Sequence, residues 1–186
     1  MSANRLRELM QNLYDAHREF KKAFQDSIAN WKGKEPLEVS SSRDKFWDAL
    51  ILLFGEIIEP LHDAFLADKI TVLDDVIDFL AIDIPAFRCG YEKEWYLRRL
   101  KSLPLSEAQK ARLKTIALDL SRKPDYRREF YDWAKLMIVL ADKPFVDELE
   151  TLLESSDEFV QKKVKRMLTV ILENRKDLRR KKLVSS

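Results

Sequence analysis

Glycine occurs only three times in this chain of 186 residues, and its scarcity limits what the chain can fold into. Sheets need many tight turns, and glycine commonly supplies the positive φ angles that such turns require. The scarcity of glycine therefore argues against β-sandwich and β-barrel folds. It also lacks the glycine-rich patterns G-x-x-x-x-G-K-S/T and G-x-G-x-x-G, which excludes phosphate-binding loops of those two kinds.

Apolar residues instead recur at helical spacing. From Leu6 to Ile28 they are three or four residues apart, which predicts a first helix over about residues 4–31. Similar stripes along the rest of the chain predict about eight helices and an all-α fold. Apolar residues form 46% of the chain and charged residues 35%, a combination typical of amphipathic helices around a core.

Breaks in the helical pattern predict how the chain is organised. Pro60 lies inside a continuing stripe, where it should kink or end a helix because its nitrogen carries no hydrogen. A second break near residue 85 predicts a seam within a single domain, residues 1–186. It separates a front subdomain, about residues 1–84, from a rear subdomain, about residues 85–174. Residues 175–186 form a basic tail that we expect to be frayed.

Capping patterns predict where three of the helices begin. Ser106 and Gln109 form an S-x-x-Q capping box, and Thr71 and Asp74 resemble one with aspartate in place of glutamate. Proline is favourable in the first turn of a helix, so Pro124 predicts the start of another.

Residues 142–174 resemble one repeat of the HEAT type. Phe145 to Leu153 is similar to the first helix of such a repeat, and residues 155–161, with Asp157 and Phe159-Val160, are similar to the turn and the second helix. The resemblance implies helix pairs stacked into a curved array that binds partners. We therefore expect an irregular N-terminal helical bundle packed on a C-terminal HEAT-like array of helical hairpins.

Cysteine content and hydropathy predict the compartment. Cys89 is the only cysteine, so no disulfide can form within the chain, which favours a reducing environment. No apolar run reaches the roughly 20 residues that a membrane span needs, and the first residues are not typical of a secretion signal. We therefore expect a cytoplasmic protein without a membrane partner.

Four acidic residues raise an enzymatic alternative. Glu56 and Glu59, followed by Asp75 and Asp78, resemble the E-x-x-E and E-x-x-D pattern of all-α nucleotide pyrophosphohydrolases. The resemblance implies a Mg²⁺-dependent phosphohydrolase in which these carboxylates hold the metal. Exposed acids on helices explain the same residues, so we favour a protein without a cofactor or a catalytic site.

Basic residues gather in the rear half, close to aromatic residues. Exposed aromatic groups with basic neighbours are typical of protein-binding surfaces. We therefore expect a non-enzymatic interaction module that binds a protein partner, as an adaptor, an immunity protein or an antitoxin does. The candidate partner-binding residues are Trp95, Tyr96, Arg98, Arg99, Arg127, Arg128 and Trp133.

Two other kinds of partner stay open at this point. A curved helical array with a basic face binds nucleic-acid backbones, so nucleic-acid binding by the rear half is an alternative. That alternative also uses a run of basic residues on the last helix, Lys162, Lys163, Lys165 and Arg166. The long first helix is a candidate interface for a homodimer.

Overall fold

The computed structural model describes residues 3–29, 37–82, 87–123 and 128–184. Every regular element within these ranges is a helix, so the predicted all-α fold is confirmed. The chain divides into two compact units, Met1–Ala86 and Phe87–Ser186, which we call unit 1 and unit 2. The single domain with subdomains stays a prediction.

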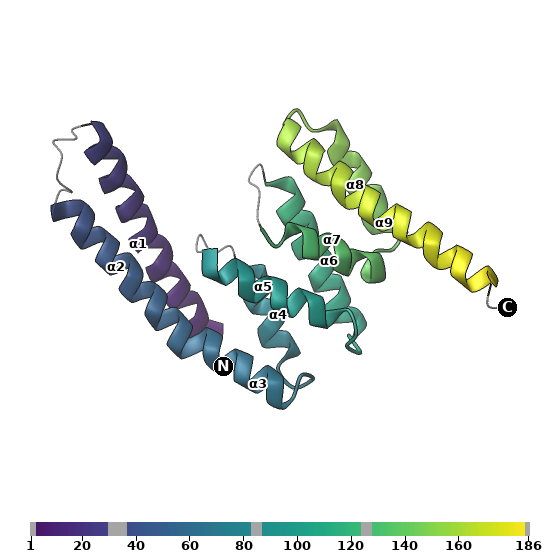
Figure 1. Ribbon diagram of the computed structural model, residues 1–186, viewed down its shortest axis with the longest axis horizontal. Coiled ribbons are helices and arrows are strands. Elements are labelled where there is room, and N and C mark those ends of the chain that lie inside the picture. The colour runs from purple at the N-terminus through teal and green to yellow at the C-terminus, as the bar shows by residue number, and fades with distance from the viewer. Residues whose placement is uncertain (1–2, 30–36, 83–86, 124–127, 185–186) are drawn as a thin grey trace. The chain divides into compact units, whose positions relative to one another are not determined.

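Unit 1 is built on a hairpin of two long helices (Figure 1). Its helices are α1 (Ala3–Ala29), α2 (Leu37–Leu53), α3 (Glu59–Ala67) and α4 (Leu73–Ala81). The hairpin is antiparallel, because Arg5 near the start of α1 pairs with Glu56 just after α2, while Glu19 pairs with Lys45. The first predicted helix is confirmed up to Ala29, and its last predicted residues lie outside the described ranges.

A short π-helix, Phe54–Ile58, joins α2 to α3 directly before Pro60. The Glu59 N–H bonds to the Phe54 carbonyl, five residues back. Proline has no N–H, and its ring would clash with the carbonyl four residues earlier in a regular helix. The wider π turn relieves that clash. Pro60 then lies in the first turn of α3, which confirms the predicted interruption.

The predicted capping box before α4 does not form. The Thr71 hydroxyl donates a hydrogen bond to the Asp68 carbonyl at 3.3 Å, within the turn that precedes the helix. Val72 occupies the N-cap position, where its side chain makes no capping hydrogen bond. The prediction from Thr71 and Asp74 was wrong because α4 begins one residue later than the pattern requires, with Val72 and not Thr71 at the N-cap.

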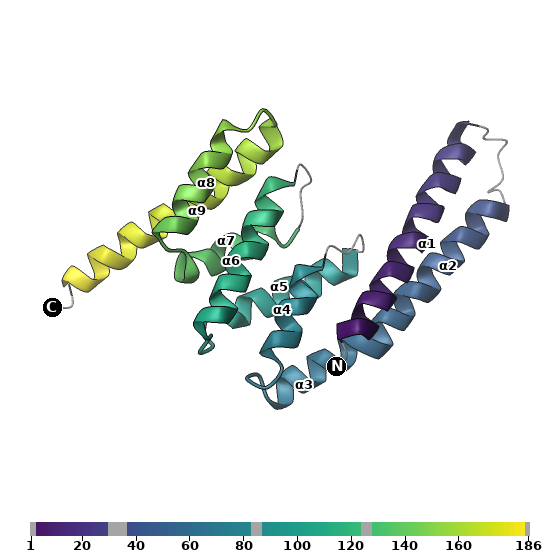
Figure 2. The ribbon, with the colours of Figure 1, turned by 180° about the vertical axis from the view of Figure 1, so that it is seen from behind.

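Unit 2 has two layers of helices. Its described helices are α5 (Phe87–Leu100), α6 (Glu107–Arg122), α7 (Phe130–Leu140), α8 (Lys143–Thr151) and α9 (Glu158–Val184). α5, α7 and α9 are neighbours in one layer, and α6 and α8 are neighbours in the other (Figures 1 and 2). Successive helices therefore alternate between the layers. The assignment of these helices to HEAT-like repeats stays a prediction.

The core of unit 2 lies between these layers. Phe130, Trp133 and Met137 recur along one face of α7 and are almost completely buried. This spacing places their side chains on one stripe of the helix. Other fully buried side chains come from α5, α6, α8 and α9, namely Tyr96, Leu97, Leu113, Leu149, Val164 and Met167.

The ends of these helices show which local signals hold. Ser106 and Gln109 form the predicted capping box of α6, with each backbone N–H donating to the other side chain, at 3.0 and 3.2 Å. α7 begins only at Phe130, after a turn, and Pro124 lies outside the described ranges. In the described parts of the chain, no helix is long and apolar enough to cross a bilayer.

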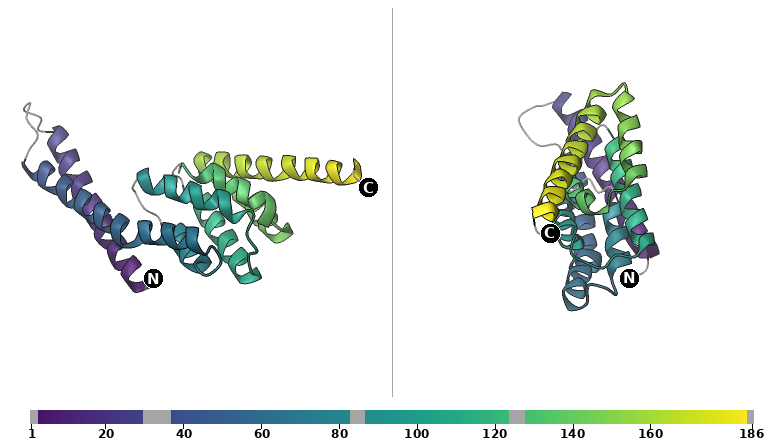
Figure 3. Two further views of the ribbon diagram at one scale, coloured as in Figure 1. Left: turned by 60° about the horizontal axis from the view of Figure 1, so that its bottom comes forward. Right: turned by 90° about the vertical axis from the view of Figure 1, so that its right-hand side faces the viewer.

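α9 continues past the ends of α7 and α8 as far as Val184 (Figure 3). The sequence predicted a frayed tail over these residues. Their stretch contains neither glycine nor proline and is rich in lysine, arginine and leucine, which are good helix formers. The backbone of the basic segment is therefore helical.

Candidate interaction surface

A network of ion pairs joins α5 to α7. The Arg98 guanidinium donates through Nε and Nη2 to the two carboxylate oxygens of Asp132, at 3.2 and 3.1 Å. The same Nη2 donates to Glu94 at 3.0 Å, one helical turn earlier on α5. Arg128 donates through Nε to the other Glu94 oxygen at 2.6 Å. Two arginines and two carboxylates thus tie the neighbouring helices together.

The carboxylates of this network are buried, whereas the arginines reach solvent. Glu94 is 6% exposed and Asp132 is 4% exposed. The pKa of Arg98 is raised above its ordinary value, first by its hydrogen bonds to Asp132 and then by the charges of Asp132 and Glu94. A buried carboxylate that lost its arginine would be left unpaired, which is costly. Arg98 therefore holds the fold together as well as lining its surface.

Arg99 and Arg128 each stack on an aromatic ring. The Arg99 guanidinium lies 3.6 Å from the centre of the Trp95 ring and donates to the Trp95 carbonyl at 3.1 Å. The Arg128 guanidinium lies 3.9 Å from the centre of the Tyr91 ring. Planar guanidinium groups favour this stacking. Arg127, the other arginine predicted here, lies outside the described residues.

Two predicted partner-binding residues belong to the core. Tyr96 and Trp133 are both 0% exposed, so a partner cannot reach them while unit 2 is folded. Trp133 lies on the same stripe as Phe130 and Met137, and Tyr96 lies next to Leu97 among buried residues of α5. Both residues are therefore core residues and not partner-binding residues, because each lies on the buried face of its helix.

In contrast to these buried residues, three aromatic rings are exposed on the layer formed by α5, α7 and α9. Tyr91 is 44% exposed, Tyr131 is 42% exposed and Phe159 is 62% exposed. A cationic side chain lies near each of these rings. Besides Arg128 over Tyr91, the Lys135 ammonium lies 4.1 Å and the Arg166 guanidinium 5.4 Å from the centre of the Tyr131 ring. Lys162 lies 5.9 Å from the centre of the Phe159 ring.

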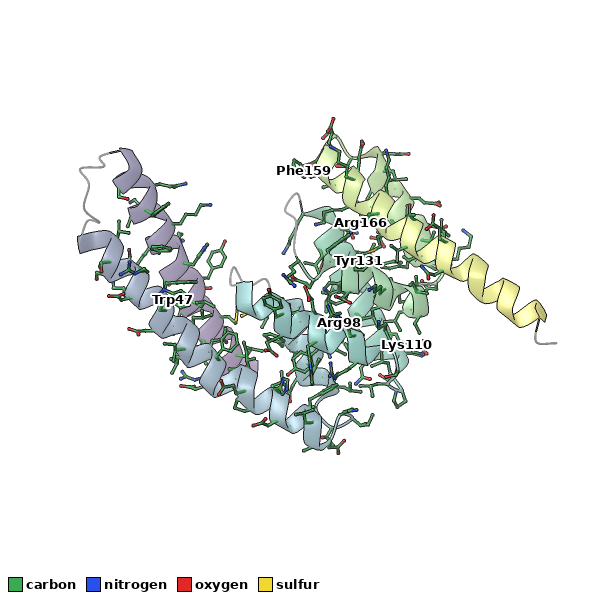
Figure 4. The ribbon with its side chains drawn as sticks, in the orientation of Figure 1. Trp47, Arg98, Lys110, Tyr131, Phe159 and Arg166 are labelled. Carbon is green, nitrogen blue, oxygen red and sulfur yellow. The ribbon has the colours of Figure 1, made fainter. Side chains whose placement is uncertain are left out.

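These contacts lie on the helices of one layer of unit 2. Figure 4 shows Phe159 and Arg166 on α9, followed by Tyr131 on α7 and Arg98 on α5. Arg166 on α9 and Lys135 on α7 share the Tyr131 ring, so the contacts bridge these two helices. We call this region the cation–aromatic surface and define it by Tyr91, Arg128, Tyr131, Lys135, Phe159 and Arg166.

Most of this surface was missed as a candidate site, although the sequence contains a signal for it. Tyr131 is followed by Lys135 four residues later, and Phe159 by Lys162 three residues later. Residues at these spacings are neighbours on a helix surface, so an aromatic residue and a cation can meet there. Phe159 lies outside the buried stripe of Val160, Val164 and Met167.

Lys163 does not contribute to a basic surface. Its side chain is buried, and its ammonium donates to the carbonyls of Leu120 and Lys123 at 2.5 and 3.0 Å. These carbonyls lie at the end of α6, where the helix dipole favours a positive charge. The ammonium also lies 5.0 Å from the centre of the Phe130 ring. Lys163 therefore fastens α9 to the end of α6.

The acidic residues of the enzymatic alternative do not form a cluster. Across the described ranges, no group of three or more histidine, cysteine, aspartate or glutamate side chains is arranged to hold a metal ion. Glu56 instead accepts two hydrogen bonds from the Arg5 guanidinium, at 2.8 and 2.9 Å. The geometry of Glu56, Glu59, Asp75 and Asp78 gives no support to a magnesium site.

Unit 1 has exposed apolar residues of its own. Trp47 on α2 is exposed (Figure 4). Ile51 and Leu52 on the same helix are also exposed, as are Tyr14 and Phe24 on α1. Trp47 contacts the Phe46 ring, which in turn stacks on Phe20 and touches His17. The homodimer through the first helix stays a prediction.

Comparisons with known proteins add no function to this geometry. No protein family, curated protein or solved structure gave a match to the chain.

Proposed function

We propose that this chain is an interaction module that binds a protein partner through the cation–aromatic surface. The proposal depends on one observation: α5, α7 and α9, the helices of one layer, each have an exposed aromatic ring beside a cationic side chain. Aromatic residues and arginine are the most frequent centres of binding energy in protein interfaces.

The cations also hold the exposed rings in place. A cation over an exposed ring contributes about 0.5–1 kcal/mol, which restricts the rotamers of both side chains. Tyr131 has cations from two helices beside its ring. Rings that are ordered before binding lose less side-chain entropy when a partner covers them. The surface is therefore suited to binding without first rearranging.

A comparative capture experiment tests the proposal. The tagged chain and its Tyr131→Ala/Phe159→Ala variant are used to capture proteins from lysate with and without nuclease treatment, with isotope labelling to quantify each captured protein. The matched control is Thr115→Ala/Glu150→Ala, which changes two exposed residues of α6 and α8 in the other layer. We expect the wild type and the control to capture one protein in similar amounts. The amount captured by the aromatic variant should be at least tenfold lower, which corresponds to about 1.4 kcal/mol of binding free energy.

Equal retention by all three chains would contradict the proposal, because binding would then not involve the surface. Loss of every bound protein after nuclease treatment would instead indicate that nucleic acid is the partner.

A further inference from the structure

We infer that the cation–aromatic surface takes an acidic, amphipathic segment of a protein, with aspartate or glutamate side chains next to large apolar ones. This inference rests on the proposed function and specifies the chemistry of the partner. It follows from the exposed rings of the surface and from the charges that lie beside them.

The carboxylates at the centre of this layer are already paired. Glu94 and Asp132 are buried and accept hydrogen bonds from Arg98 and Arg128. Their charges therefore offset those of the two arginines and do not attract a basic partner. Because they are fixed beneath the surface, they also oppose a dense line of phosphates passing over the arginines.

Two cationic side chains lie beside the Tyr131 ring. Within the described ranges, Lys135 has no carboxylate partner, and its ammonium lies against the Tyr131 ring. Arg166 approaches the same ring from α9. A carboxylate of a partner can bind these two groups from solvent while an apolar side chain lies against the exposed part of the ring.

Phe159 supplies an apolar contact on the same layer. It is the most exposed of the three rings and has no polar group, so covering it removes apolar area from water. Lys162 beside it is paired with Glu158 at 3.0 Å. A segment that extends from Tyr131 to Phe159 thus meets positive charge at one ring and an apolar contact at the other.

Defined probes test this inference on the full chain by fluorescence anisotropy. The first probe is a labelled peptide of glutamate, leucine and phenylalanine in an amphipathic order. The second has lysine in place of every glutamate, the third has serine in place of every apolar residue, and the fourth is single-stranded oligothymidine. We expect the first peptide to bind about tenfold more tightly than each of the others.

Charge reversal provides the matched comparison. Lys135→Glu/Arg166→Glu should lose that preference and bind the lysine peptide at least as tightly as the glutamate peptide. The control Lys110→Glu/Lys143→Glu makes the same charge change on α6 and α8, in the other layer, and should keep the wild-type order. Circular dichroism of both variants checks that they retain the helical fold.

Three results would overturn the inference: equal binding of all peptides, tighter binding of the lysine peptide by the wild type, or tightest binding of the oligonucleotide. Its failure can be told apart from failure of the proposed function. If Tyr131→Ala/Phe159→Ala abolishes capture of a protein while the charge reversal does not, the surface binds a partner that is not acidic. If neither variant loses a protein, both proposals are wrong.

Discussion

Lys163 in unit 2 is a charged residue with a structural role. Lys163 belongs to the basic run that the nucleic-acid alternative uses, yet its ammonium is buried against two carbonyls at the end of α6. The carbonyls and the lysine are about forty residues apart in sequence, so no local pattern could predict the contact.

Replacing Lys163 tests this role. Lys163→Met keeps an unbranched side chain of similar length but leaves the carbonyls of Leu120 and Lys123 without that donor. We expect the free energy of unfolding to fall by about 2 kcal/mol, the usual cost of an unsatisfied buried acceptor. The exposed neighbour Lys165→Met should change it by less than about 0.5 kcal/mol. Urea denaturation measures both, and equal stability of the two variants would show that the ammonium does not stabilise the end of α6.

Asp142 at the start of α8 makes stability depend on pH. Its pKa is lowered below the ordinary value, first by a hydrogen bond from the Lys114 ammonium and then by one from the Phe145 backbone N–H. A carboxylate with a lowered pKa in the folded state stabilises the fold above its unfolded pKa. That contribution is lost as the pH falls through the folded pKa.

Asp142→Asn isolates the charge, because asparagine caps a helix about as well as aspartate. We expect the wild type to be the more stable chain above about pH 5 and the difference to vanish as the pH falls towards about 3. Urea denaturation at several pH values measures it. A difference that stays constant over this range would mean that the Asp142 charge does not contribute.

At the scale of helices, one of the two predicted capping boxes forms and the other, at Thr71 and Asp74, does not. Ser106 and Gln109 are three residues apart and form the predicted box. Pro60 interrupts its helix as expected, but the π turn before it depends on the neighbouring backbone and was not predicted. The candidate site was predicted less well: Arg99 and Arg128 stack on aromatic rings, whereas Tyr96 and Trp133 are buried in the core.

The exposed rings were missed because a sequence pattern does not show which residues of a helix the neighbouring helices cover. Helical spacing separates the two faces of a helix, but it does not say how wide the buried face is. Phe159 and Val160 are adjacent in sequence, and only Val160 is buried. The width of the buried stripe depends on which helices lie alongside, which is a property of the assembled layers.

Gly55, in the π turn, offers a test at this scale. A Cβ atom added there would meet no atom of the described residues within 4 Å, so alanine fits. Because glycine loses more backbone entropy on folding, Gly55→Ala should raise the free energy of unfolding by about 0.5–1 kcal/mol. At Gly90, a Cβ would lie 3.4 Å from a Glu129 carboxylate oxygen, so Gly90→Ala should gain less. A loss of stability in Gly55→Ala would show that the π turn requires glycine.

For the whole molecule, binding and stability should be separable. Tyr131 and Phe159 are exposed, so removing their rings leaves no cavity in the core. We expect Tyr131→Ala/Phe159→Ala to change the free energy of unfolding by about 1 kcal/mol or less, from the lost cation contacts. Thermal denaturation followed by circular dichroism measures the change. A loss of several kcal/mol would mean that these rings stabilise unit 2 and that lost binding reflects unfolding.

Site-specific photo-crosslinking in the cells that naturally contain the chain tests protein binding by this surface most directly. Benzoyl-phenylalanine replaces Tyr131, which keeps an aromatic ring there, or Thr115 on α6 as the control. We predict one crosslinked protein of defined mass from the Tyr131 position, unaffected by nuclease, and none from the Thr115 position. Equal crosslinking from both positions, or none from Tyr131, would contradict the proposal that the cation–aromatic surface binds a protein partner.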